Sequence, residues 1–89
     1  MDRQRAEAVA LQAVAFVIGD DTLRQRFLTV SGCPPEELRQ RVQDPAVLVG
    51  VLEFLAANEP DLLRFADAAR LPPPALRQAL GALGNDWET

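Results

Sequence analysis

The feature that most constrains the fold is a stretch of sequence that the chain contains twice. Residues 27–42 read FLTVSGCPPEELRQRV, and residues 65–80 read FADAARLPPPALRQAL. The copies align without a gap at an offset of 38 positions, and the same offset extends the match to residues 8–42 and 46–80. The repeat predicts two tandem halves of similar structure, related by a pseudo-two-fold axis.

Each half has the pattern of three helices, so the sequence predicts an all-α domain of five to six helices. Residues 3–18 and 46–57 are rich in strong helix formers and apolar almost all round, which places both helices at the centre of the domain. In each half a capped helix and then a proline-led helix follow. The predicted apolar stripes of these helices are Leu23, Phe27 and Val30; Leu38 and Val42; Leu62, Phe65, Ala66 and Ala69; and Leu76, Leu80 and Leu83.

Glycines mark three positions where the prediction is specific. Gly32 has the place of a left-handed residue that ends a helix, whereas the second copy has Arg70, which must adopt that geometry or end its helix differently. Gly50 lies inside a predicted helix, where a close helix crossing would justify its low propensity. Gly84 is expected to end the last helix and leave residues 85–89 as a flexible acidic tail.

Four phenylalanines are the only large aromatic residues besides one tryptophan. Phe16 and Phe54 are equivalent in the two copies, as are Phe27 and Phe65. A chain of 89 residues has little apolar surface for two separate cores. The four rings are therefore predicted to form the centre of one shared core, within a single domain over residues 1–89.

Composition excludes several chemistries. The chain has no histidine and no tyrosine, so the commonest general base and metal ligand is missing, and no phosphate-binding or nucleophile motif occurs. Cys33 aligns with Leu71 and is expected to be a small buried hydrophobe. The sequence thus predicts no catalytic residues, no metal site and no cofactor, and the protein is not expected to be an enzyme.

Five side chains are candidates for contact with a partner. Arg39, Gln40, Arg77 and Gln78 lie on the short helices that follow the proline corners, and Trp87 is the one tryptophan. Arginine and glutamine can read guanine and adenine, and the flanking helices resemble a helix-turn-helix. Acidic or apolar residues begin both would-be recognition helices, however, and the net charge is −4, so nucleic acid is an unfavoured partner. The alternative for these side chains is an ordinary solvated helix face.

The order of an Ala-rich first helix, SGCPPEELRQRVQDP and VLEFLAANEPDLLRFADAARLPPPALRQAL resembles a family of small bacterial proteins, found mainly in alphaproteobacteria and classed as a domain of unknown function. The resemblance covers residues 6–83 and implies a compact helical fold in the cytoplasm. It supplies no site residues.

The sequence therefore favours a non-enzymatic protein-interaction or structural module, acting on an unknown protein partner or as a homodimer. The single cysteine and the absence of a leader or spanning segment lead us to expect a cytoplasmic protein without membrane contact. A nucleic-acid-binding regulator is the alternative.

Overall fold

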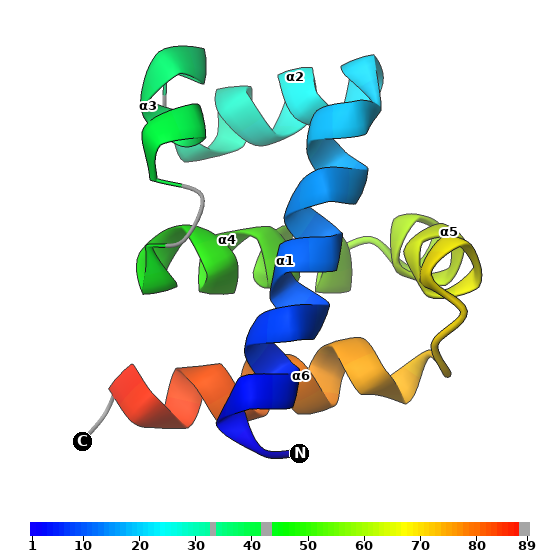
Figure 1. Cartoon of the computed structure of the whole chain (residues 1–89). Coiled ribbons are helices and arrows are strands. Elements are labelled where there is room, and N and C mark those ends of the chain that lie inside the picture. The colour runs from blue at the N-terminus through cyan, green and yellow to red at the C-terminus, as the bar shows by residue number, and fades with distance from the viewer. Residues whose placement is uncertain (33, 42–43, 88–89) are drawn as a thin grey trace.

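The computed structural model describes residues 1–32, 34–41 and 44–87, with the backbone alone for Pro35, Leu38, Arg39 and residues 84–87. This part of the chain is helical throughout and has no strand, which confirms the predicted all-α class. The helices are α1 (Arg3–Gly19), α2 (Asp21–Ser31), α3 (Pro35–Gln40), α4 (Pro45–Ala56), α5 (Glu59–Ala69) and α6 (Pro74–Trp87) (Figure 1).

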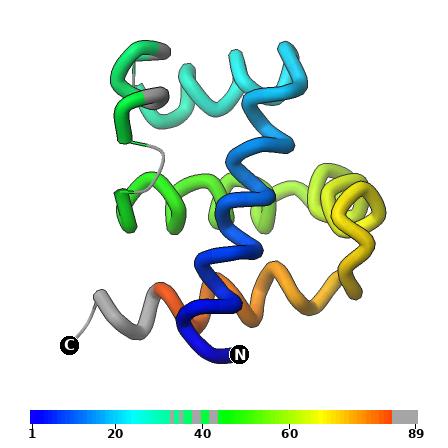
Figure 2. Tube along the Cα trace, in the orientation of Figure 1, coloured from blue at the N-terminus to red at the C-terminus, as the bar shows by residue number. Residues whose placement is uncertain are grey.

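The helices form a flat body about two helix diameters thick, with extents of 30 × 30 × 18 Å. Helix α1 lies across α4 and α6, and these three make the most extensive contacts in the molecule (Figure 1). The Cα trace shows the first turn of α1 beside α6, at the end of the body opposite α2 (Figure 2). The first and fourth helices are central, as predicted, and α6 joins them.

Small residues on α1 explain how three helices share one core. Ala6, Ala10 and Ala13 are fully buried, so the neighbouring helices come close to the α1 backbone. The remaining space is filled by aliphatic side chains and the ring of Phe65. The largest fully buried ones are Phe65, Leu23, Leu52, Leu55, Leu76, Val17 and Val51.

Short polar side chains start the helices. The carboxylates of Asp20 and Asp44 and the amide oxygen of Asn58 accept backbone N–H bonds at the starts of α2, α4 and α5. At the opposite end of α2, Gly32 has φ 70° and is left-handed, which confirms its predicted role as the helix terminator. Arg70 adopts the same geometry with φ 56°, so it tolerates the left-handed region.

Several features recur at the 38-residue offset. Helices α2 and α5 have bounds one offset apart, and the end of α1 and the start of α3 agree with those of α4 and α6 to within one residue. Helix α6 runs on to Trp87, well beyond the position equivalent to the end of α3. Phe27 packs on Phe54 with ring centroids 5.5 Å apart, and the equivalent pair Phe65 and Phe16 lies at 5.6 Å. Superposition of the complete halves stays a prediction.

The four phenylalanines belong to one hydrophobic core, as predicted, but they do not together form its centre, so that part of the prediction is wrong. They make two separate pairs, one between α2 and α4 and one between α5 and α1. Phe27 and Phe65 are buried, but Phe16 and Phe54 are only partly buried. Phe65 is fully buried among the aliphatic side chains of the core, whereas Phe16 and Phe54 pack against its border.

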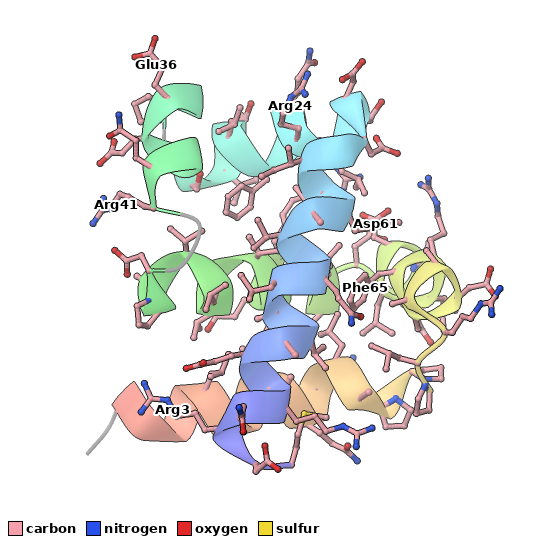
Figure 3. The ribbon with its side chains drawn as sticks, viewed as in Figure 1. Arg3, Arg24, Glu36, Arg41, Asp61 and Phe65 are labelled. Atoms are coloured by element: carbon pink, nitrogen blue, oxygen red, sulfur yellow. The ribbon has the colours of Figure 1, made fainter. Side chains whose placement is uncertain are left out.

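The third helices of the two halves are not placed alike. Helix α6 packs on α1, α4 and α5, whereas α3 makes no comparable packing with any helix in the described part of the chain. Glu37 and Arg41 explain this, since they occupy the positions at which α6 has the buried residues Ala75 and Ala79. Their side chains form an exposed ion pair of 2.8 Å, and Arg41 points away from the body (Figure 3).

Two further expectations are wrong. Gly50 is not at a close helix crossing, because a Cβ built on it would meet no atom within 4 Å. Helix α6 continues through Gly84 to Trp87, so Gly84 does not end it and residues 85–87 are not a separate tail. Glycine permits a left-handed turn without requiring one, and no proline follows to stop the helix. The predicted roles of Cys33, Leu38 and Val42, and residues 88–89 of the tail, lie outside the described residues.

Candidate functional site

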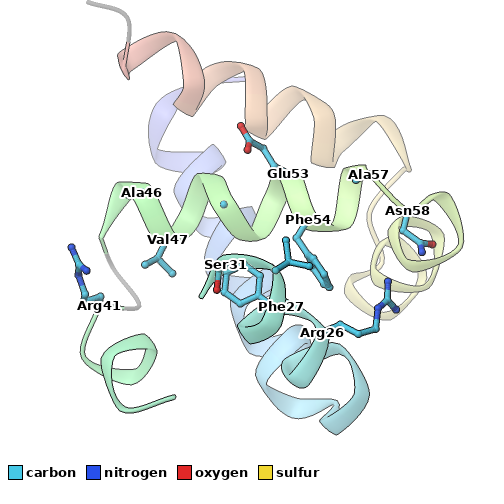
Figure 4. Close-up of a pocket in the computed structure, with 12 residues that line it drawn as sticks. Arg26, Phe27, Ser31, Arg41, Ala46, Val47, Glu53, Phe54, Ala57 and Asn58 are labelled. Carbon is cyan, nitrogen blue, oxygen red and sulfur yellow. The ribbon is translucent and has the colours of Figure 1, made fainter. Parts of the chain in front are cut away.

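A groove between α2 and α4 is the site that the structure offers. It has a volume of about 730 Å³ and extends to Arg41, in the segment between α3 and α4. It follows α4 from Ala46 to the C-cap residue Ala57, about three turns or 16 Å of helix. Its lining residues are Arg26, Phe27, Val30, Ser31, Arg41, Ala46, Val47, Gly50, Glu53, Phe54, Ala57 and Asn58 (Figure 4).

Val30 shows that the groove is open. The sequence predicted this valine in the buried stripe of α2, but it is 76% exposed, and that prediction is wrong. The residue lies one turn beyond Phe27 on the same helix, facing the space that α3 leaves uncovered by standing at the edge of the body. An exposed β-branched residue beside two aromatic rings is the pattern of a contact surface rather than of isolated surface apolarity.

Arg26 closes one end of the groove. Its guanidinium carbon lies 5.5 Å from the centre of the Phe54 ring, an arrangement that attracts the cation to the ring face. Its Nη2 atom is also 3.0 Å from Oδ2 of Asp61, as an ion pair without hydrogen-bond geometry. The arginine is therefore fixed between α4 and α5 and holds the Phe54 ring in place.

Asp61 is the buried acid of this region, with 4% of its surface exposed (Figure 3). It lies in the first turn of α5, where the helix dipole stabilises a negative charge. Arg64 approaches its other oxygen at 3.9 Å and also reaches Oδ2 of Asp20 at 3.4 Å. Arg26 and Arg64 are equivalent in the two copies, so two repeat-related cations meet at a single carboxylate and tie α2 to α5.

Asp20 connects this network to the start of α2. The backbone N–H of Leu23 donates to Oδ1 of Asp20 at 3.0 Å, and this bond is the main reason why the pKa of Asp20 is lowered from 3.8. Desolvation raises the pKa, while the Thr22 N–H and Arg64 lower it further. The carboxylate thus stays ionised to lower pH than an isolated aspartate does.

A second hollow lies between α1 and α5. It measures about 440 Å³ and is smaller than the groove. Every residue that lines it is separated by 38 positions from a residue that lines the groove: Gln12, Ala15, Phe16, Phe65, Ala68 and Ala69. Gly50 has the place of Gln12, so the floor of the groove lacks a long side chain that the smaller hollow possesses.

The predicted contact residues lie elsewhere and do not come together. Gln40 is exposed on α3, while Arg77 and Gln78 are exposed on α6, on the other side of α4 (Figure 1). The side chain of Arg39 lies outside the described residues. Trp87 belongs to the last turn of α6, and its side chain also lies outside them.

The geometry of α5 and α6 gives no support to DNA reading by this pair. A recognition helix contacts bases with its N-terminal residues. In the first turn of α6, Ala75 and Leu76 are buried, and the exposed Pro74 has no N–H to donate. Arg77 and Gln78 are left as an exposed pair without neighbouring donors at the helix start.

Two further observations limit the chemistry of the described residues. No three acidic or cysteine side chains among them gather in the way a metal ion would need. None of the helices that they form is both long and apolar enough to cross a bilayer.

These features define a small all-α domain with an open apolar groove between two of its helices. The chain belongs to the family described as Protein of unknown function (DUF3572), whose model matches residues 3–86. This match confirms the resemblance noted from the sequence. No match was found among the curated proteins or among the solved structures.

Sequence reasoning missed the groove, although its signals are present in the chain. Glu37 and Arg41 stand where the second copy has alanines, which indicates a third helix that cannot be buried in the same way. Gly50 opposite Gln12 is the other signal. Both become visible only when the differences between the copies are read as closely as the matches.

Proposed function

We propose that this protein is a non-enzymatic protein-interaction module of the cytoplasm, and that the groove between α2 and α4 is its binding surface. The observation that supports this most directly is Val30, exposed for 76% of its surface beside Phe27 and Phe54. An apolar surface of this kind gains free energy when a partner removes it from water.

The shape of the groove fits binding better than catalysis. Its walls are aromatic and aliphatic, and its two arginines are already paired, Arg26 with Asp61 and Arg41 with Glu37. Arg26 and Arg41 line the two ends of the groove, and the apolar floor between them supplies the contact area. An apolar centre with a charged border is typical of protein interfaces.

Photo-crosslinking tests the proposal. The photoreactive residue p-benzoylphenylalanine replaces Val30, and in a matched control it replaces Leu63, an exposed leucine of α5 outside the groove. Irradiation in the native cell should give a product of one defined partner from position 30 and not from position 63. A product of twice the chain mass would identify a homodimer.

The proposal fails if both positions give the same products or if neither gives any. A parallel titration with mixed-sequence DNA examines the alternative function. Binding that weakens steeply with increasing salt would favour a nucleic-acid-binding regulator, because phosphate contacts release counterions.

A further inference from the structure

Gly50 is unexplained by the structure of the chain itself. It lies in the interior of α4, where glycine lowers helix stability relative to alanine. Its backbone is not left-handed, since Gly32 is the one described glycine with positive φ, and a Cβ at Gly50 would meet nothing within 4 Å. Neither backbone geometry nor internal packing therefore requires glycine at this position.

The position of Gly50 supplies the explanation. It lies in the floor of the groove, one helical turn after Ala46, and the equivalent position in the other copy carries Gln12. A pair of small residues one turn apart lets a second backbone come close to a helix. Glycine at this position leaves space for a binding partner, because no other part of the described chain fills that space.

A helix of a partner protein fits the groove beside Gly50. The groove follows α4 for about three turns, and the rings of Phe27 and Phe54 form a wall along it. The fold already contains one such contact, in which α6 packs on α1 and buries Ala75, Leu76, Ala79 and Leu83. A helix with a stripe of Ala and Leu therefore has the right shape and chemistry for the uncovered face of α4.

Charge selects among such helices. Glu53 is exposed at the rim, on the side of α4 away from Phe27 (Figure 4). Among the interactions of the described residues it has no ion pair, whereas Arg26 and Arg41 at the groove ends are both neutralised. The chain has a net charge of −4, so it attracts a basic partner and repels a second copy of itself.

We infer that the groove binds a basic amphipathic α-helix of a partner protein, with a small residue of that helix on Gly50 and a lysine or arginine facing Glu53. The inference rests on the proposed function and specifies the occupant of the same surface.

Two synthetic peptides test it against the full chain. Both are about five turns long and have the same Leu-Ala-Leu stripe; one carries Lys at all other positions and the other Glu. Binding is followed by calorimetry and by amide shifts of α2 and α4. The Lys peptide should bind at least about tenfold more tightly than the Glu peptide.

Variants locate the bound peptide. Gly50→Gln introduces the residue found at the equivalent position 12 and leaves the net charge unchanged. It should weaken binding of the Lys peptide by about tenfold or more. Gly81→Gln is the matched control, because Gly81 is also in a helix with open space around it but lies outside the groove. It should leave binding unchanged. Glu53→Gln should weaken the Lys peptide by roughly threefold to tenfold.

Each other result overturns the inference. Failure of both peptides to bind, or equal binding of both, shows that the groove does not select a basic helix. Unchanged binding by Gly50→Gln shows that no helix crosses α4 at this glycine, and a homodimer that buries Val30 assigns the groove to a second copy. If photo-crosslinking at position 30 still captures a partner, the proposed function stands and the occupant is of another class.

Discussion

Replacing Phe65 and Phe54 separately by alanine tests which of the two rings is buried and which lies on an open surface. Phe65 is 1% exposed although it borders the smaller hollow, so Phe65→Ala should remove an almost fully buried ring and cost about 3–5 kcal/mol. Phe54 is partly buried and lines the open groove. Its removal widens a space that water already reaches. The expected loss is the ring contact with Phe27, about 0.5–1.5 kcal/mol, plus the Arg26 contact, about 0.5–1 kcal/mol.

Urea and thermal melts distinguish these costs. With an unfolding entropy of roughly 2.1 cal/mol/K per residue, 1 kcal/mol corresponds to about 5 °C for this chain. Phe65→Ala should lower the melting temperature by about 15–25 °C, and Phe54→Ala by about 5–13 °C. Phe65→Leu, which keeps most of the volume, should recover much of the loss. Equal destabilisation by the two alanine variants would show that the groove is closed in solution and would refute the assignment of Phe54 to an open surface.

Three further predictions concern single positions. Gly50→Ala should raise the free energy of unfolding by about 1 kcal/mol in urea melts, and Gly81→Ala should do the same, since neither Cβ meets an atom within 4 Å; a loss at either position would contradict the open space. Arg70→Gly should stabilise the protein and Gly32→Ala destabilise it, each by about 1–2 kcal/mol, because both residues are left-handed; urea midpoints that move the other way would exclude backbone strain. The folded-state pKa of Asp20 is lowered from 3.8, so its stabilising contribution is present above that value and is lost as pH falls through the folded pKa. The free energy of unfolding should therefore fall less on acidification in Asp20→Asn than in the wild type. Identical pH profiles of stability would show that this carboxylate contributes nothing.

The helix order could be predicted from sequence because its signals are local. Capping residues such as Asp20, Asp44 and Asn58 and a glycine such as Gly32 act on their own backbone within a few residues. The helix end predicted at Gly32 agrees with the structure. Arg70 followed the same rule even though its side chain disfavours the left-handed region.

The open face of the domain could not be predicted in the same way. Val30 satisfied the spacing of a buried stripe, yet burial requires a second surface, and α3 does not supply one. Periodicity shows which side of a helix is apolar without showing what covers it. The same limit explains why all four phenylalanines were placed at the centre of the core, although Phe16 and Phe54 lie at its border.

The sequence by itself determined the helices and most of their ends, since propensity, caps and prolines act over a few residues; the end of α6 beyond Gly84 is the exception. The tertiary structure decided in which copy the third helix packs on the core: α6 does so, and α3 does not. Ala75 and Ala79 let α6 approach α1, while Glu37 and Arg41 at the equivalent places keep α3 in solvent, because burying two charges costs more than the short helix can return. That difference between two related units leaves the groove between α2 and α4 open.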